Sequence, residues 1–365
     1  MSNLIRTSPE LEAACAACRA EGILSLDTEF VWMSTYRPRL GLVQLGCRGG
    51  VWALDCLKGT DVTALKNLIE DPSVVKILHD ARQDLQHLLH YTGALPQNVF
   101  DTQCAAAFAG FPAGIGLQKL LFEAIDVGLP KTETCTDWIQ RPLSDAQVAY
   151  ALDDVRYLPA LRDELLKRAR ELGTADWLSE ELKKYDNPLI YADYDPDEVW
   201  KRVKTGRIRL DSKGFAILKA VAALREEKAQ EWNLPKNWLG DDESLTEMAY
   251  QGTVRRFHHR LKGGQADIMK GLFRQAIEAA VKTPEEDWPD NPRPHYIREV
   301  QDAAAQAVEW LREKAEALHV DPTMIANRAT VTAYVDNVDD YRNPLADGWR
   351  YEVVGREMAE LFGVE

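Results

Sequence analysis

The 365-residue sequence lacks any hydrophobic run of the roughly 18 consecutive apolar residues that a membrane-spanning helix needs. Its first residues, MSNLIRTSPELEAACAACRA, lack the basic start and apolar core of a secretory signal. No low-complexity tract is present, and a composition of 45% hydrophobic and 28% charged residues is typical of globular proteins. These absences argue against a membrane or disordered chain, and we expect a cytoplasmic protein.

Cysteine is scarce and unevenly placed. All six cysteines lie within the first 135 residues, at Cys15, Cys18, Cys47, Cys56, Cys104 and Cys135. A chain long enough to bury a large core does not need a disulfide framework, so we expect a reducing environment. Cys15 and Cys18 form a C-x-x-C, but no second pair follows at zinc-finger spacing, and we interpret both as core residues. No Ser/His/Asp or Cys/His catalytic set is apparent.

Positive charge is also in short supply, because the formal net charge is −14. The distribution is informative: residues 201–282 carry 17 Lys and Arg against 10 Asp and Glu, whereas the regions on either side are acidic. Phosphate contacts require basic side chains, and metal sites for hard cations require carboxylates. The pattern therefore indicates an acidic part that could hold metal and a basic part that could hold a polyanion.

Short apolar runs and helical periodicity divide the chain into an α/β region and a helical region. Predicted strands cover residues 23–30, 40–46, 51–55, 74–78 and 98–102. Predicted helices cover residues 8–20, 61–70, 80–90, 103–110, 117–126 and 145–172, and no convincing strand follows. A weak repeat of Leu-Arg-Glu with a later proline indicates two helical modules. The predicted domains are 1–198, 199–286 and 287–365.

The segment ILSLDTEF, residues 23–30, places two carboxylates at the end of a buried strand. Side chains two positions apart on a strand point to the same face, so Asp27 and Glu29 emerge side by side. Burying two unpaired carboxylates together is unfavourable because of desolvation and mutual repulsion. The pair predicts a bound cation, and a divalent metal fits carboxylate oxygens best.

Two more acids lie four residues apart near the start of the helix predicted at 80–90. Asp80 precedes Gln83 by three positions, the arrangement of an N-cap residue with its reciprocal glutamine. Asp84 comes one turn later, at the edge of the apolar face that contains Leu85 and Leu88. We predict that Asp80 caps the helix and that Asp84 is a third metal ligand.

The helix predicted at 145–172 supplies the last acid. Tyr150 and Asp154 are four residues apart and share one helix face, whereas Asp153 points about 100° away from Asp154. The spacing therefore selects Asp154. A tyrosine one turn from a metal-binding carboxylate can orient or activate a water molecule.

LDTEF, HDARQDL and the late Y-x-x-x-D resemble, in order and spacing, the three exonuclease motifs of the DEDDy superfamily. The segments TYRPRLGLVQL, FDTQ and TDWIQRPLSDAQVAYALDDVRYL, followed by two helical modules, resemble the ribonuclease D family specifically. The resemblance implies an α/β RNase H-like mixed-sheet catalytic domain followed by two all-α HRDC-like domains. The second of these modules departs most from the pattern, because it is strongly acidic.

The resemblance also implies an activity: hydrolytic 3′ to 5′ removal of single nucleotides from RNA, without a small-molecule cofactor or a membrane partner. The implied substrates are single-stranded RNA 3′ ends, notably those of transfer RNA precursors. Two alternatives stay open from the sequence, a DEDDy exonuclease that acts on DNA and a catalytically idle RNA-binding scaffold. Retention of all five motif residues argues against the idle scaffold.

Carried over by position, the family's roles imply two ions, Mg²⁺ or Mn²⁺. Asp27 would bridge both ions, Glu29 and Asp154 would complete the site beside the attacking water, and Asp84 would hold the other ion largely through water. Tyr150 would orient or activate the nucleophile. Two ions about 4 Å apart can stabilise both the attacking and the leaving oxygen of an in-line displacement.

Further residues are candidates for contact with RNA. Thr28 and Phe30 could touch the terminal nucleotide through backbone and stacking. Gln44 and His79 recur in the resembling segments, although a sheet glutamine and a strand-end histidine are more often structural. The basic region offers Lys201, Arg202, Lys204, Arg207 and Arg209 near the junction, and a second cluster of Arg255, Arg256, Arg260 and Lys262. We expect Arg255, Arg256 and Arg260 to bind phosphates.

Overall fold

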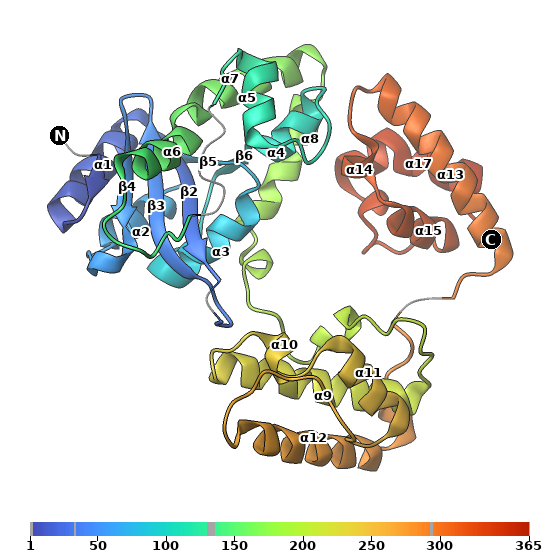
Figure 1. Ribbon diagram of the computed structural model, residues 1–365. Helices are drawn as coiled ribbons and strands as arrows, with labels where there is room; N and C mark the ends of the chain where they lie inside the picture. The colour runs from blue at the N-terminus through green and yellow to red at the C-terminus, as the bar shows by residue number, and fades with distance from the viewer. Residues whose placement is uncertain (1–2, 33, 130–135, 293–294, 365) are drawn as a thin grey trace. The chain divides into compact units, whose positions relative to one another are not determined.

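The structure is a computed structural model that describes residues 3–32, 34–129, 136–292 and 295–364 (Figure 1). Cys135 lies outside the described residues, and the other five cysteines are free thiols. The chain forms two compact units. The first comprises Met1–Val31, Leu40–Ala192 and Tyr296–Glu365, and the second comprises Trp32–Arg39 and Asp193–His295. The division into three domains stays a prediction.

A six-stranded mixed sheet forms the centre of the first unit. Its strands are β1 (Leu4–Ile5), β2 (Ile23–Val31), β3 (Arg39–Cys47), β4 (Gly50–Asp55), β5 (Val75–Leu78) and β6 (Val99–Asp101). The strand order is β1-β4-β3-β2-β5-β6. β3 and β4 are antiparallel, whereas β1 with β4, β2 with β5 and β5 with β6 are parallel. This confirms the predicted mixed sheet. β1 was not predicted, because two residues are too few to show the alternation of a strand in the sequence.

Helices cover both faces of this sheet. They are α1 (Ser8–Glu21), α2 (Thr63–Ile69), α3 (Ala81–Thr92), α4 (Thr102–Phe108), α5 (Leu117–Ile125), α6 (Asp145–Arg156), α7 (Leu158–Glu171) and α8 (Ala175–Leu182). The alternation along β2 directs Leu24 and Leu26 into one hydrophobic cluster with α1, α2 and α3. Ile23 belongs to the opposite cluster, which contains α6 and α7. Residues of β2 with odd numbers therefore face α6.

The single helix expected over 145–172 is wrong, because α6 ends at Arg156 and α7 begins at Leu158. Pro159 is the physical reason. Its ring removes the amide that would bond to the carbonyl of Val155 and clashes with that carbonyl. Pro159 is instead accommodated in the first turn of α7, where the missing N–H has no helical partner anyway.

The rest of the first unit is helical and contains α13 (Arg298–Ala317), α14 (Pro322–Ile325), α15 (Arg328–Asp336), α16 (Gly348–Arg350) and α17 (Arg356–Phe362). Trp349 anchors this part: its ring packs edge-on to Phe108 of α4 at 5.4 Å and stacks on Trp177 of α8 at 5.8 Å. Arg350 adds an ion pair with the buried Glu181 at 2.8 Å. These C-terminal helices thus share a hydrophobic core with α4 and α8.

The second unit is formed around α9 (Ser212–Glu231), with α10 (Lys236–Leu239), α11 (Asp242–Gln251) and α12 (Gln265–Lys282). Its own core includes Trp200, Val221, Met248 and Phe273. Among the residues that the structure describes, no strand follows Asp101, as predicted. None of the described helices has the length and apolar character needed to cross a bilayer.

Candidate active site and metal centre

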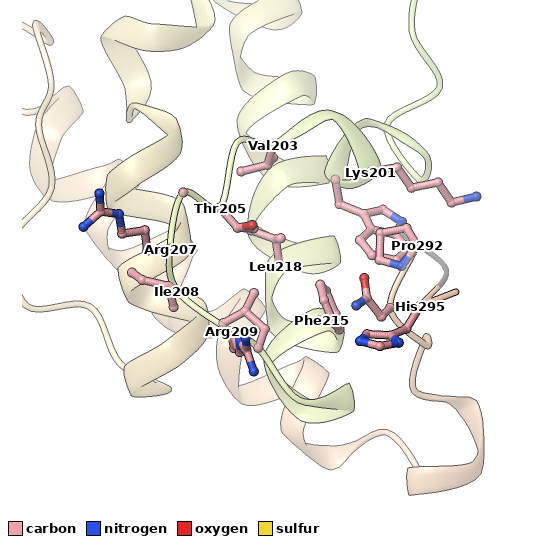
Figure 2. A pocket seen from close by; sticks show the side chains of 14 residues that line it. Lys201, Val203, Thr205, Arg207, Ile208, Arg209, Phe215, Leu218, Pro292 and His295 are labelled. Atoms are coloured by element: carbon pink, nitrogen blue, oxygen red, sulfur yellow. The ribbon is translucent and has the colours of Figure 1, made fainter. Parts of the chain in front are cut away.

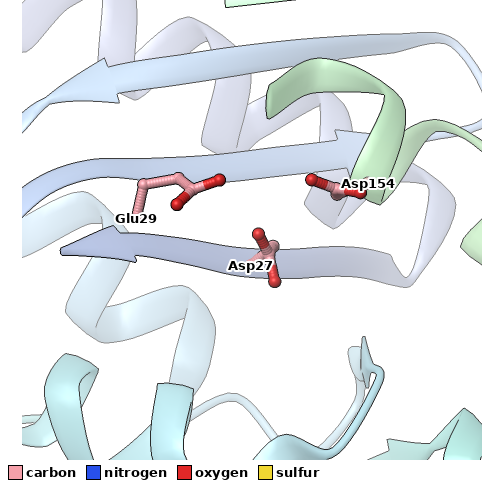
Figure 3. A group of neighbouring side chains, drawn as sticks. All are labelled: Asp27, Glu29 and Asp154. Carbon is pink, nitrogen blue, oxygen red and sulfur yellow. The ribbon is translucent and has the colours of Figure 1, made fainter. Parts of the chain in front are cut away.

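Three of the predicted ligands converge where β2 passes beneath α6. Asp27 and Glu29 are two positions apart on β2 and face the same side, and Asp154 comes from the third turn of α6 (Figure 3). One carboxylate oxygen from each lies within 4.8 Å of the others. The capping box of Ser144 and Gln147 fixes where α6 begins, and therefore which of its residues face the strand.

Asp84 reaches the site from the other layer. β5 pairs with β2 only at Ile23–Ser25, so β2 continues past the end of its neighbour and leaves an open edge beside Asp27. α3 follows β5 directly and brings Asp84 to that edge, where its carboxylate accepts a hydrogen bond from the Thr28 hydroxyl. Asp84 is therefore adjacent to the three clustered carboxylates and is not one of them.

The expectation that Asp80 caps α3 through its side chain is wrong. Asp80 occupies the N-cap position, but its backbone is left-handed (φ 58°) and its side chain makes no capping hydrogen bond. Asp101, at the end of β6, accepts from the amides of Asp80 and Ala81 at 3.0 and 3.2 Å instead. The buried carboxylate of Asp101, on a neighbouring strand, thus does the work expected of the Asp80 side chain. The spacing of residues around Asp80 in the sequence cannot show such a long-range contact.

Burial and mutual repulsion disfavour the charged form of each carboxylate in the cluster. Burial first, and the neighbouring carboxylates second, raise the pKa of Asp27 well above its usual range. The same two causes raise the pKa of Glu29 to about 8. Burial raises the pKa of Asp154 to about 7, with help from Asp153 and Asp84, and burial raises the pKa of Asp84 to about 7.

The donor set fits a divalent metal. Within the described part of the chain, no Lys or Arg forms an ion pair with Asp27, Glu29, Asp84 or Asp154. Several carboxylate oxygens at close range, without a basic partner, are the ligands that Mg²⁺ and Mn²⁺ prefer. The residues present can therefore hold a hard divalent cation.

Tyr150 lies one helical turn before Asp154 and borders a cavity. Burial and the charges of Asp154, Glu29 and Asp27 raise its pKa to about 12. A cavity of about 660 Å³ is lined by Tyr150 and Asp154 together with the N-cap residue of α5, residues of α5 and the segment after it: Gly116, Leu117, Gln118, Lys119, Phe122, Gly128 and Leu129. Phe122 is 61% exposed and forms an accessible aromatic wall.

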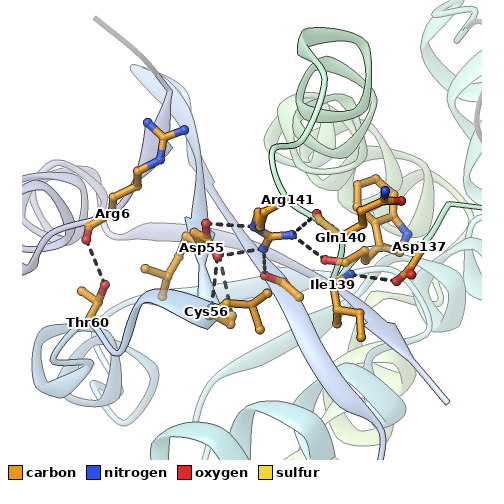
Figure 4. A network of polar contacts seen from close by, with 12 residues as sticks. Arg6, Asp55, Cys56, Thr60, Asp137, Ile139, Gln140 and Arg141 are labelled. Carbon is orange, nitrogen blue, oxygen red and sulfur yellow. Dashed lines mark hydrogen bonds and ion pairs between the residues drawn. The ribbon is translucent and has the colours of Figure 1, made fainter. Parts of the chain in front are cut away.

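Arg141 fixes the segment that leads into α6 (Figure 4). Its guanidinium donates to both carboxylate oxygens of the buried Asp55 at 2.7 and 3.0 Å. It also donates to the carbonyls of Gly41 and Trp138 at 3.0 and 2.8 Å. Trp138 in turn stacks on Tyr150, with ring centroids 6.4 Å apart and planes at 24°. A Cβ on Gly41 would lie 2.2 Å from the Trp138 carbonyl oxygen, so only glycine permits this approach.

Replacing Arg141 with glutamine is expected to lower the melting temperature on the order of 10 °C. The change leaves Asp55, whose side chain is 1% exposed, as an unpaired buried carboxylate, which costs about 3–5 kcal/mol. The double change Arg141→Gln and Asp55→Asn is expected to recover much of the loss, because it removes the buried charge. Thermal melts of the two variants test this, and an unchanged melting temperature for Arg141→Gln alone would contradict it.

The remaining predicted contacts are placed as follows. Phe30 packs edge-on against His87 of α3, with ring centroids 4.2 Å apart. Both ring nitrogens of His79 are engaged, with the Thr102 hydroxyl at 2.9 Å and the Ile115 carbonyl at 3.0 Å. Gln44 is fully buried on β3, and its amide has no hydrogen-bond partner among the described residues. Arg255, Arg256 and Arg260 are exposed in the second unit.

Sequence reasoning assigned no role to Trp138, Arg141 or the wall formed by Phe122. Trp138 and Arg141 belong to the segment TDWIQRPLSDAQVAYALDDVRYL. The neighbouring sequence does not show that Arg141 reaches Asp55 or that Trp138 reaches Tyr150. The Arg-Pro pair at positions 141 and 142 signals a turn at most. Phe122 is in an apolar helix, and its outward direction depends on how α5 packs.

Comparison with known proteins agrees with this geometry. Residues 3–170 match a family model described as 3′-5′ exonuclease. The chain is 35% identical to ribonuclease D of Desulfotalea psychrophila, over 96% of both chains. It is 33% identical to ribonuclease D of Pseudomonas paraeruginosa, over 97% of this chain and 96% of that one. The crystal structure of Escherichia coli RNase D, described as an exoribonuclease involved in structured RNA processing, superimposes on this chain with a TM-score of 0.86. The two sequences are 28% identical, and the superposition covers 99% of this chain and 98% of that chain.

Proposed function

This chain belongs to the ribonuclease D family of hydrolytic 3′-5′ exoribonucleases, and we propose on that premise that its carboxylate cluster binds two divalent ions, Mg²⁺ or Mn²⁺. The observation that carries the proposal is the convergence of Asp27, Glu29 and Asp154 within 4.8 Å, without a basic partner among the described residues. Asp84 lies beside them and supplies the fourth carboxylate. The whole site is built from the residues that the exonuclease motifs contribute.

Two ions bound there would stabilise the charge that develops on the attacking and leaving oxygens during phosphodiester hydrolysis. The chain's own residues hold these ions and position the reactants. Asp27 has Glu29, Asp154 and Asp84 as charged neighbours and would be shared by both ions. Tyr150 lies one helical turn before Asp154, so its hydroxyl would orient or activate the attacking water.

We place the 3′-terminal nucleotide in the cavity that Tyr150 and Asp154 border. The exposed ring of Phe122 can stack on a base, and Lys119 and Gln118 can contact sugar or phosphate oxygens. Thr28 and Phe30 stay candidates for contact on the opposite side of β2. For Gln44 and His79 a structural role is the better proposal, because one is buried and the other has both nitrogens engaged.

The proposed cellular substrates are transfer RNA precursors with 3′ trailers, processed in the cytoplasm. The relation to E. coli RNase D, whose description names structured RNA processing, supports a substrate in which single-stranded ends adjoin structured RNA. A precursor carrying a short trailer is expected to lose it one nucleotide at a time, and to be spared at the paired acceptor stem. Products are resolved on a sequencing gel; a trailer that survives while unstructured RNA is degraded would contradict this assignment.

Neutralising Arg255, Arg256 and Arg260 with glutamine is expected to weaken RNA binding and its salt dependence. All three are exposed and belong to the basic region, and each phosphate contact to a single strand contributes about 0.7 to the log-log salt slope. Turnover of saturating short RNA should barely change, since these residues are remote in sequence from the motifs. Binding titrations at several salt concentrations test this; an unchanged slope would exclude the cluster from RNA recognition.

A further inference from the structure

A buried polar contact between β2 and α3 takes no part in the proposed mechanism. Thr28 and Phe30 are two positions apart on β2 and point to the same side, opposite to the two acids of the same strand. On α3, His87 comes three positions after Asp84 and therefore lies on the same side of the helix. The two pairs face each other, since Thr28 contacts both Asp84 and His87, and Phe30 contacts His87.

The hydrogen-bonding capacity of each group gives this contact a direction. An ionised carboxylate only accepts, so the Thr28 hydroxyl donates its single hydrogen to Asp84. Nδ1 of His87 lies 3.4 Å from the Thr28 oxygen, at the long end of hydrogen-bond distances. Because that oxygen has no second hydrogen to offer, Nδ1 of His87 is the donor. The hydrogen bonds therefore run from His87 through Thr28 to the Asp84 carboxylate.

Burial holds the His87 ring in this orientation. His87 and Thr28 are each 5% exposed, and the His87 ring packs edge-on against Phe30 with ring centroids 4.2 Å apart. Leu85 and Leu88, on either side of His87 along α3, belong to the hydrophobic core. A buried polar group without a hydrogen-bond partner destabilises a fold, so the contact with Thr28 fixes the rotation of the ring.

Exposed polar side chains elsewhere in the chain are not confined in this way. Arg207 and Arg209 lie on a loop that borders a groove of the second unit, and both are exposed (Figure 2). Exposed side chains exchange between rotamers within nanoseconds and give a neighbouring group no fixed direction. Thr28 and His87 are buried, so they can impose one orientation on the carboxylate that contacts them.

We propose that His87 is a positioning residue for Asp84 and acts through the Thr28 hydroxyl. The proposal rests on the proposed function, because that function makes Asp84 a ligand of a divalent ion. Asp84 lies beside the three clustered carboxylates and not among them, and Thr28 directs its carboxylate. Hydrogen-bonding partners of a metal ligand orient it, and their removal usually weakens metal binding about 10- to 100-fold.

The test measures Mn²⁺ binding by the full chain without RNA, from the electron paramagnetic resonance signal of the free ion. Thr28→Val keeps the shape of the side chain and removes the hydroxyl, so we expect Mn²⁺ to bind about 10- to 100-fold more weakly. His87→Phe keeps a ring beside Phe30 and removes the N–H. For this variant we expect a loss of about 3- to 10-fold, as for one hydrogen bond. Circular dichroism verifies that each variant is folded.

A double substitution tests whether His87 acts through Thr28. If it does, adding His87→Phe to Thr28→Val causes no further loss of Mn²⁺ affinity, because the connecting hydroxyl is already gone. His87→Asn restores an N–H donor near the position of Nδ1 and is expected to retain most of the affinity. His90→Phe makes the same change at an exposed position one turn later on α3, and is expected to leave Mn²⁺ binding unchanged.

Losses that multiply in the double substitution would overturn the proposal, because His87 and Thr28 would then act independently. An unchanged Mn²⁺ affinity in His87→Phe, or equal losses in His87→Phe and His87→Asn, would also overturn it. If His87→Phe does not fold, His87→Leu takes its place in the same comparisons. Failure of the proposed function is distinct: the unmodified chain would bind no Mn²⁺, whereas failure of the His87 proposal leaves that binding intact.

Discussion

Replacing Asp27 with asparagine is expected to abolish RNA hydrolysis while the protein stays folded. Asp27 has Glu29, Asp154 and Asp84 as charged neighbours, and in the proposed site it would be shared by both ions. A neutral amide is a poor ligand for a hard divalent cation. Turnover of single-stranded RNA by the purified variant measures the effect, and circular dichroism verifies the fold.

The same variant is expected to be more heat-stable than the wild type when metal is absent. Carboxyl groups with raised pKa values bind protons more tightly in the folded state, so the folded state loses stability as pH rises. For Glu29 and Asp154 this loss begins near the usual carboxyl pKa of about 4 and is complete above their folded values of about 8 and about 7. Removing the charge of Asp27 reduces the electrostatic repulsion that Glu29 and Asp154 experience at high pH.

Thermal melts in chelator at pH 5 and pH 8 test this. We expect the wild type to lose melting temperature between the two pH values, and Asp27→Asn to lose less. Added Mg²⁺ should stabilise the wild type at pH 8 and have little effect on the variant. A variant that melts below the wild type at pH 8 in chelator would assign Asp27 a structural role.

Asp84→Asn is expected to reduce turnover by orders of magnitude, whereas Asp80→Asn should be nearly silent. Asp84 is half-buried beside the cluster, and its carboxylate accepts from Thr28. Asp80 is exposed, its side chain makes no capping bond, and asparagine tolerates its left-handed backbone. The two substitutions are chemically identical and only four residues apart, so each is the control for the other.

Rates on saturating RNA, together with melting temperatures, separate the two positions. Equal loss of turnover at both would show that Asp80 also takes part in the reaction. A large loss of stability for Asp80→Asn would show that its carboxylate, and not that of Asp101, holds the start of α3.

The acids of β2 were predictable because strand alternation is strictly local. Asp27 and Glu29 must share a face once residues 23–30 form a strand, and helical spacing then selects Asp154 over Asp153. The long-range relations were not predictable in this way. Asp101 takes the place of a cap for α3 because β6 ends next to β5, which only the assembled sheet determines.

The network around Arg141 shows the same limit. Asp55 and Arg141 are far apart in sequence, and their ion pair forms because residues 136–143 cross β3 at Gly41. The sequence of residues 136–158 gives no indication that this segment crosses β3. The break between α6 and α7 is different, since Pro159 is visible in the sequence and a stricter reading of its effect on the preceding turn would have found it.

The central claim is tested most directly by incubating the purified protein with matched 5′-labelled RNA and DNA strands, with and without chelator. We predict a ladder of RNA products, each shortened by one nucleotide from the 3′ end. We also predict that the ladder stops in chelator and returns with Mg²⁺ or Mn²⁺, and that DNA is cut more slowly. Undiminished cleavage in chelator, or internal fragments in place of a ladder, would contradict metal-dependent 3′-5′ hydrolysis at the Asp27 site.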